Sequence, residues 1–439
     1  MKKLFIIGLS MLMLIGLTAS AFATDITLSG KIEVRGEYNA NTTDYDESRG
    51  DVGKWYDENT MLRVDAKVTP RTSGVIILEG DGANGYGNQV NTDVWGQNAS
   101  NATGYGEGNT TTDVISIREA YIHHTGSGLL GIPSGLKIGR MSAILGRGLF
   151  FDHTLFGDQG IMLYANPTKG SQIFLLTLKL DENTIIGAST AVTPQSDDTD
   201  SYVVGYSNSV SGVNLSGDLT YVDDQDITAY TSVTGRRVTS PLHLWNLGVR
   251  ADAAVGIANL YGDLEMQYGK ARNNYLERNA GVREDRTFKG FALLLGGKVD
   301  VKPARLNFEF AYGTGDKRNY SVTNANDGTA TFDSEADNEA FQTTLGADQQ
   351  HYTYVYEDRV PAATGARSTG LTNTMYLKAG AETDINPDLS LGGAIYYLRA
   401  TNDTNVGGAR TSSVATRLEA SKDLGWEFDG NLAYKLDTN

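Results

Sequence analysis

The sequence predicts an all-β fold, a transmembrane antiparallel β-barrel of about 18 strands, and three observations support this prediction. Many segments alternate apolar and polar residues with a period of two, as in a strand with two unlike faces. The polar face of these segments carries many charges, which suits a wet lumen inside a lipid-facing wall. The connections between the segments alternate between short links and long polar links.

The N-terminus has the pattern of a secretory signal peptide. Two lysines precede an apolar core at residues 4–17, and Ala-Phe-Ala at 21–23 places small residues where a signal peptidase reads. We therefore expect residues 1–23 to be a signal peptide and residues 24–439 to form a single outer-membrane barrel domain. The competing interpretation is a membrane anchor, which the short apolar core and the polar residues after it disfavour.

Composition excludes several classes of protein. The 439 residues include 53 acidic and 37 basic side chains, a formal net charge of −16, which argues against a nucleic-acid partner. There is no cysteine, so disulfides, thiolate metal sites and thiol catalysis are absent. The five histidines fit no catalytic or metal-binding pattern. We therefore expect no enzymatic activity, no metal site and no cofactor.

Seven segments show the alternation most clearly. In the first, residues 26–38, every even residue is apolar or glycine and nearly every odd residue is polar. The others are, in chain order, 62–68, 174–180, 215–221, 245–251, 306–312 and 426–434. Aromatic side chains recur near the apolar-face ends of the predicted strands, where the interfacial girdle of a membrane barrel lies. These are Tyr38, Tyr221, Trp245, Tyr268, Tyr312, Tyr397 and Trp426.

The links between strands indicate the topology. Short links are predicted at 70–74, 166–170, 211–212, 256–258, 302–304, 386–388 and 423–425. Long polar links are predicted near 39–59, 83–112, 145–159, 181–200, 223–241, 271–286, 314–370 and 401–410. All eight prolines fall in links, where a missing N–H is tolerated. Short links on one side and long links on the other are typical of a barrel with periplasmic turns and outer loops.

If the strands run alternately outward and inward across the membrane, starting outward at Ile26, the pattern gives 17 strands. The last of them, residues 426–436, also runs outward. Bacterial single-chain barrels close with an even number of strands. We therefore expect an 18-stranded barrel whose final strand is missing from this chain. The alternative is a miscounted pair of strands, for which residues 184–193, assigned to a loop in this count, are the first candidate.

Residues 116–152 contain three motifs that belong together. They read SIREAYI at 116–122, LKIGR at 136–140 and GLFFD at 148–152. This stretch resembles the alginate-export-type outer-membrane porins, in which an REAY strand leads into a GR strand and an inward-folding loop. The resemblance implies an 18-stranded outer-membrane channel in a Gram-negative envelope. It does not by itself imply the substrate for which the family is named.

The charges on the polar face argue against a dedicated polyanion exporter. A pore for a polyanion should be lined mainly by arginine and lysine. The predicted polar face instead carries about sixteen acidic and about eleven basic side chains. We therefore expect a passive porin for ions and small hydrophilic solutes with a weak cation preference. The candidate lining and constriction residues are Arg35, Arg63, Lys67, Arg118, Glu119, Arg140, Arg147, Asp152, His153, Arg250, Asp252, Arg305, Glu309, Arg417 and Glu419.

The long link at 145–159 is the expected source of a constriction. It carries Arg147 and Asp152 among glycines and large apolar residues, and such a loop is ill suited to bulk water. Two placements remain open: the loop folds against the inner wall, or it packs on its neighbours outside the pore. If it folds inward, neutralising Arg140 and Arg147 together should change the ion selectivity.

The outer loops carry acidic runs at 44–47, 197–200, 223–226 and 333–339. Clustered carboxylates suit divalent cations that bridge lipopolysaccharide phosphates, but no run matches a calcium-loop pattern, and solvated loops are the simpler interpretation. The expected partners are outer-membrane lipid, lipopolysaccharide and small solutes, with a homo-oligomer left open. A second functional class also stays open: a barrel sheath around a partner such as an outer-membrane electron-transfer complex, or a scaffold that displays residues 314–370.

Overall fold

A computed structural model describes most of the predicted strands and several of the loops between them. The described residues are 25–39, 53–80, 116–128, 131–181, 198–225, 228–229, 238–239, 241–276, 283–315, 320–321, 331–332, 337–344, 352–353, 370–404 and 421–436. The chain divides into two compact units, 1–37 with 54–141 and 38–53 with 142–439. Arg417, Glu419 and the loop candidate at 184–193 lie outside the described residues.

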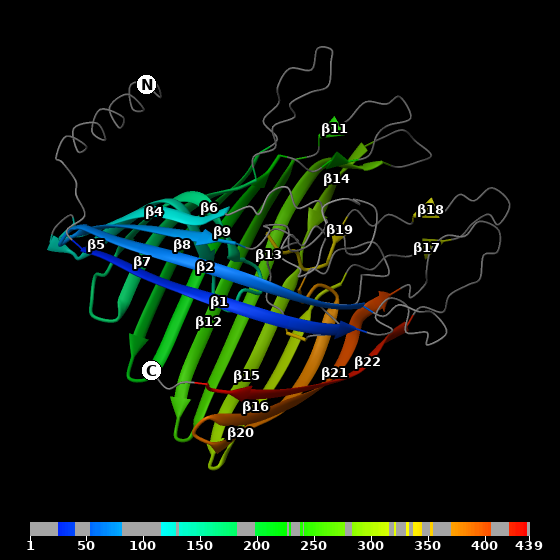
Figure 1. Cartoon of the computed structure of the whole chain (residues 1–439). Helices are drawn as coiled ribbons and strands as arrows, with labels where there is room; N and C mark the ends of the chain where they lie inside the picture. Colours follow the sequence, from blue (N-terminus) through cyan, green and yellow to red (C-terminus); the bar gives the residue numbers. More distant parts are fainter. Residues whose placement is uncertain are drawn as a thin grey trace, which may run out of the picture. The chain divides into compact units, whose positions relative to one another are not determined.

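The first unit is built from five strands that pair in sequence order (Figure 1). They are β1 (Asp25–Asn39), β2 (Gly53–Thr69), β3 (Thr72–Glu79), β4 (Ser116–Gly126) and β5 (Ser134–Ile144). The predicted short link after β2 is a tight turn, since β3 begins three residues after β2 ends. The REAY and GR motifs lie on β4 and β5, which are antiparallel neighbours with Ala120 opposite Arg140.

The second unit continues the same hairpin order over a longer stretch. Its long strands are β6 (Asp152–Ala165), β7 (Ser171–Asp181), β8 (Thr199–Val210), β9 (Val213–Asp224), β12 (Leu242–Val255), β13 (Ala258–Leu276), β15 (Phe291–Val301), β16 (Ala304–Gly313), β20 (Thr374–Asn386), β21 (Leu389–Thr404) and β22 (Ser421–Tyr434). Each pairs antiparallel with the next one in this series.

Short strands complete this unit. β14 (Arg283–Phe288) precedes β15, and both pair with β13. β19 (Asp337–Asn338) lies parallel to β14. Two further pairs are formed by β10 (Thr228–Ala229) with β11 (Val238–Thr239), and by β17 (Tyr320–Ser321) with β18 (Thr331–Phe332). The main strand order contains 18 of the described strands. The predicted all-β antiparallel fold of about 18 strands is thereby confirmed.

The predicted turn at 423–425 is wrong. These residues lie inside β22, which pairs with β21 from Thr404↔Ser421 to Leu389↔Tyr434. The register shifts where Gly425 takes a φ of +110°, so the local irregularity is a bulge rather than a turn. β22 therefore runs back to the short link at 386–388, where the N–H of Lys435 donates to the carbonyl of Asp388 at 2.7 Å. The predicted outward direction of residues 426–436 is also wrong.

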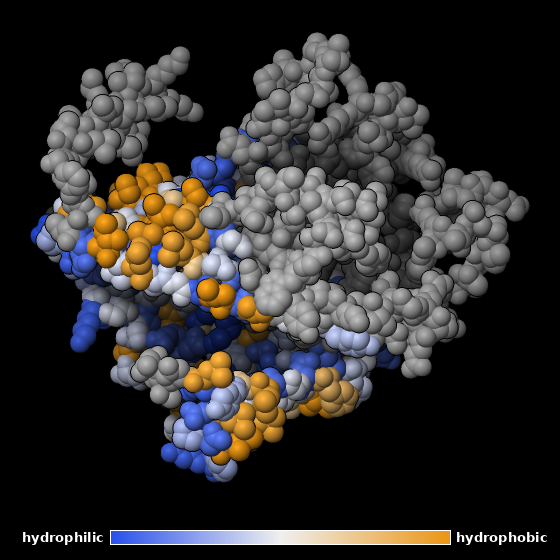
Figure 2. Space-filling model, in the orientation of Figure 1, coloured by the Kyte–Doolittle hydropathy of each residue, from blue (hydrophilic) through white to orange (hydrophobic). Residues whose placement is uncertain are grey.

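β12 has two unlike faces, as the alternation predicts. On β12, Trp245, Leu247 and Val249 are exposed, whereas Asn246 and Arg250 are buried on the opposite face. We call the face of the sheet that carries Asn246 and Arg250 the polar face. On β7 the predicted faces are wrong, because Leu176 and Leu178 are buried and Lys179 lies on the opposite face with the exposed Ile173 and Leu175. Figure 2 shows exposed hydrophobic residues gathered in patches along the strands. No helix among the described residues is long and apolar enough to cross a membrane.

Candidate functional site

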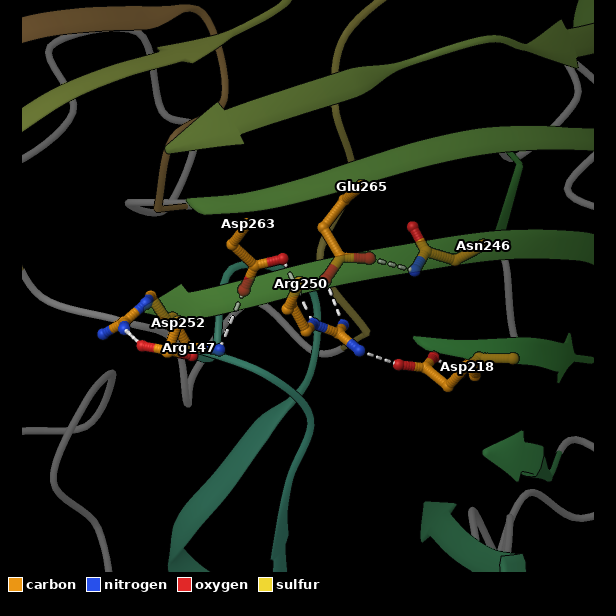
Figure 3. Close-up of polar contacts among 8 residues, drawn as sticks. Arg147, Asp218, Asn246, Arg250, Asp252, Asp263 and Glu265 are labelled. Atoms are coloured by element: carbon orange, nitrogen blue, oxygen red, sulfur yellow. Dashed lines mark hydrogen bonds and ion pairs between the residues drawn. The ribbon is translucent and has the colours of Figure 1, made fainter. Parts of the chain in front are cut away.

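Arg250 is the centre of a buried ion cluster on the polar face (Figure 3). It lies on β12 opposite Asp263 of β13, and its Nε is 3.1 Å from the Asp263 Oδ1. Its two terminal nitrogens donate to Asp218 of β9 and Glu265 of β13. The Asn246 Nδ2 donates to the other Glu265 oxygen at 2.6 Å. One guanidinium group on β12 thus joins three carboxylates from the two strands on either side of it.

The strand period brings this cluster together. Asn246 and Arg250 are even residues of β12, and Asp263 and Glu265 are odd residues of β13, so all four face the same side of the hairpin. Gly248 lies between the first two, and a Cβ there would overlap the guanidinium group of Arg250. The arginine can therefore lie flat across the strands only because this position has no side chain.

The loop at 145–151 lies on the same face and touches the cluster with its backbone. The Arg147 N–H donates to the Asp263 Oδ2 at 2.9 Å, and the Arg147 side chain pairs with Asp252. The Arg147 guanidinium group also lies 3.9 Å from the ring centroid of Tyr261, within cation–π range. Gly146 has a φ of +59°, and a Cβ there would overlap Arg250. Glycine satisfies both requirements at this point of the loop.

The apolar residues of the loop are buried. Leu149, Phe150 and Phe151 have at most 3% of their surface exposed, and the N–H of Leu145 donates to the carbonyl of Phe151 at 3.0 Å. This hydrogen bond closes the loop on itself before β6 begins. Of the two placements that the sequence leaves open, the loop occupies the polar face of the sheet.

Of the predicted site residues, the structure brings Arg147, Arg250 and Asp252 together. Glu309 of β16 lies beside them, because it accepts a hydrogen bond from the Tyr261 hydroxyl at 2.8 Å and another from Tyr376. The arrangement couples the loop tip to residues of β12, β13, β16 and β20. It can present a guanidinium group and carboxylates to a polar solute.

The predicted residues Asp152, His153 and Arg305 lie elsewhere in the second unit. Asp152 accepts hydrogen bonds from the backbone and hydroxyl of Thr154, at 3.2 and 2.7 Å. His153 is fully buried and bonds Asp158 and Thr344, so it is a packing and hydrogen-bonding residue rather than a lining one. Arg305 forms exposed ion pairs with two acidic residues of β20, at 2.8 and 2.7 Å.

The remaining predicted residues belong to the first unit. Arg63 pairs with Asp65 on β2 at 2.7 Å, and Arg118 of β4 pairs with Glu79 of β3 at 2.7 Å. Glu119 is buried, which makes it unsuitable for contact with a solute. The other three are Arg35 on β1, Lys67 on β2 and Arg140 on β5.

Sequence reasoning missed several members of the site. Asp218, Asp263 and Glu265 belong to the acidic residues of the polar face but are absent from the predicted lining set, as are Asn246 and Tyr261. Their proximity depends on strand register. Within the described ranges, no group of three or more histidine or acidic residues is arranged to hold a metal ion.

Neither a scan against family models nor a search of curated proteins finds a match. Among solved structures, the chain is similar to the anion-selective porin from Comamonas acidovorans, with 13% identity, a TM-score of 0.43, and 93% of this chain and 98% of that chain covered. OccK11 of Pseudomonas aeruginosa has 12% identity and a TM-score of 0.46, with 95% and 88% covered. OmpT, an outer membrane protein of Vibrio cholerae, has 8% identity and a TM-score of 0.45, with 95% and 99% covered. None of these names the alginate-export-type family, so that finer resemblance stays a prediction.

Proposed function

We propose that this chain is an outer-membrane channel for passive diffusion of ions and small hydrophilic solutes, with a weak cation preference. The observation that supports the proposal is the position of the loop at 145–151 on the polar face. Its tip at Arg147 lies on the charged face of strands whose opposite face exposes apolar side chains. In a membrane barrel the polar face lines the water path and the apolar face meets lipid.

The loop tip is the part of this site that a solute can reach. The side chains of Arg147 and Asp252 are 32% and 45% exposed, whereas the Arg250 side chain beneath them is only 5% exposed. Arg147 and Asp252 are therefore the proposed contact residues of a constriction. The buried Arg250 cluster holds the loop through Asp263. Arg250 is therefore proposed as a supporting residue rather than the lining residue that the sequence predicts.

The charge balance of the loop tip and the buried Arg250 cluster together supports the cation preference. Two guanidinium groups, on Arg147 and Arg250, face four carboxylates, a formal charge of −2. The carboxylates belong to Asp218, Asp252, Asp263 and Glu265. Charged side chains at a narrow point select permeant ions by sign. The excess is small and mostly buried, so the expected selectivity is weak.

The outer-membrane setting of the proposal rests on the apolar face. Four aromatic residues are in register across four neighbouring strands: Tyr202, Tyr221, Trp245 and Tyr268. Three of them, Tyr202, Trp245 and Tyr268, are about half exposed. Such a row fits the aromatic girdle at the boundary between lipid and water. Lys179, Asp200, Asp223, His243 and Lys270 form the next row toward the long links. A charged row just beyond the girdle fits the headgroup region of the bilayer.

Single-channel recording of the purified full chain in a planar bilayer under a salt gradient tests the proposal. Large ohmic steps with a small cation-selective reversal potential are expected. An anion-selective reversal potential would contradict the cation preference alone. Silence from a correctly folded barrel would contradict the channel and favour the sheath.

A further inference from the structure

A further segment, residues 337–344, belongs to the long connection 314–370 and contacts the loop at 145–151. The Thr344 N–H donates to the Phe150 carbonyl at 3.1 Å, and the Thr344 hydroxyl lies 3.3 Å from the same oxygen. The Thr344 Oγ1 is also 2.8 Å from the His153 Nε2. One threonine thus bonds both the loop and the first residues of β6.

Aromatic packing reinforces these hydrogen bonds. The Phe341 ring meets the Phe150 ring edge-on, with centroids 6.5 Å apart at an interplanar angle of 65°. Phe151 stacks on His153 at 4.3 Å, and His153 is fixed on its other side by Asp158. Phe341, Phe151 and His153 have no exposed surface. The aromatic part of the contact is therefore closed to solvent, and Thr344 lies half-buried at its edge.

The segment is attached to the sheet independently of the loop. The Gln267 side chain of β13 bonds the Gln342 backbone in both directions, donating to its carbonyl at 2.7 Å and accepting from its N–H at 2.8 Å. The Phe341 N–H donates to the Thr314 carbonyl at 2.9 Å, and the Thr372 hydroxyl donates to the Phe341 carbonyl at 2.6 Å. A segment fixed by these four hydrogen bonds can hold the loop at 145–151 in place.

The loop at 145–151 needs such an attachment, because the backbone around its tip is weakly restricted. Both residues that flank Arg147 are glycines with positive φ, Gly146 and Gly148, and glycine restricts the backbone least. The loop tip is fixed through Asp263, Asp252 and the Tyr261 ring. Its base is fixed through Thr344 and Phe341. The position of the Arg147 charge therefore follows from both attachments.

We infer that residues 337–344 are a positioning element of the constriction, with Phe341 and Thr344 as the positioning residues that keep the Arg147 loop on the polar face. This inference rests on the proposed function for its consequence, a change in conduction. It gives part of the long connection 314–370 a role inside the channel in addition to any role at the surface. Loop and segment act as one constriction unit.

The absence of native cysteine allows a direct test of loop docking. Leu149 of the loop is 3% exposed, so a Leu149→Cys variant should react slowly with a water-soluble thiol reagent. Adding Thr344→Val removes the hydroxyl without changing the shape of the side chain. The loss of the hydrogen bond between the Thr344 hydroxyl and the His153 Nε2 then favours release of the loop, and the rate of modification is expected to rise about tenfold. Thr344→Ser keeps the hydroxyl and should restore the slow rate.

The matched control is Leu178→Cys on β7, where the leucine is 1% exposed and lies outside the loop and segment. Its modification rate should not respond to Thr344→Val. A rate at Leu149→Cys that stays unchanged in Thr344→Val and in Phe341→Ala would overturn the inference. An equal rise at both cysteines would also overturn it, because the threonine would then support the whole fold.

Single-channel recording of Thr344→Val separates this inference from the proposed function. Docking of the loop is measured by the rate of cysteine modification, which does not depend on conduction. A wild-type protein that shows no current would therefore refute the proposed channel and leave the result on loop docking valid. If the loop is released and the channel conducts, more frequent transitions between two current levels are expected. Release of the loop with an unchanged current would contradict the role of the unit as the constriction.

Discussion

Replacing Arg250 by methionine tests the buried ion cluster most severely. Methionine keeps most of the length of the side chain and removes its charge. The Arg250 side chain is 5% exposed, and the side chains of its three carboxylate partners are at most 1% exposed. Removing one partner of a buried ion pair costs about 3–5 kcal/mol, because the other charge stays buried without compensation. Three carboxylates are affected by this change, so the loss should lie at or above the upper end of that range.

The assay is equilibrium unfolding by denaturant in lipid vesicles, followed by the fluorescence of the four tryptophans. The matched control is Arg305→Met, since Arg305 also bridges two acidic residues, Glu382 and Asp384, but in pairs that are about half exposed. Solvent screening makes such pairs contribute little, so this variant should unfold close to the wild type. Equal shifts of the two midpoints would refute the reasoning that burial decides the energy.

Three further predictions concern the loop and the apolar face. Gly146→Ala places a Cβ against Arg250, so it should release the loop and raise the conductance. The control is Gly212→Ala, at a glycine with a φ of +82° and open space around it. This change adds only backbone strain of roughly 1–2 kcal/mol, and the variant should conduct like the wild type. Arg147→Gln removes one of the two guanidinium groups, so the reversal potential should move further to the cation side; a move to the anion side would contradict the assigned charge balance. Trp245→Ala removes a ring 4.7 Å from its neighbour on β9 and should lower the free energy of unfolding in vesicles by about 0.5–1.5 kcal/mol beyond the loss of area, which an unchanged unfolding midpoint would contradict.

Part of the site was accessible from the sequence. The short link predicted at 256–258 joins β12 to β13, and a tight turn fixes the register of a hairpin. Counting back from that turn places Arg250 opposite Asp263, as the structure has them. The two-residue period then places Glu265 on the same face as both. The register of neighbouring strands was therefore an available signal that sequence reasoning did not use.

Other contacts could not be read from the sequence. Arg147 and Asp252 are 105 residues apart, and Phe150 meets Thr344 across 194 residues. No local pattern specifies such pairs, because they depend on how two long links fold over the sheet. The turn predicted at 423–425 is a different kind of error, because there a local pattern was present and was misinterpreted. A glycine beside charged residues is as typical of a β-bulge as of a turn.

Cysteine accessibility along β12 tests the central claim, that the polar face lines a water path and the apolar face meets lipid. Asp252 on the polar face is replaced by cysteine in one variant, and Val249, which is 50% exposed on the apolar face, in another. With the protein in a bilayer, a charged thiol reagent should modify Asp252→Cys and reduce the single-channel current, and should leave Val249→Cys unmodified. Rapid modification of Val249→Cys, or modification of Asp252→Cys without any change in current, would contradict the account.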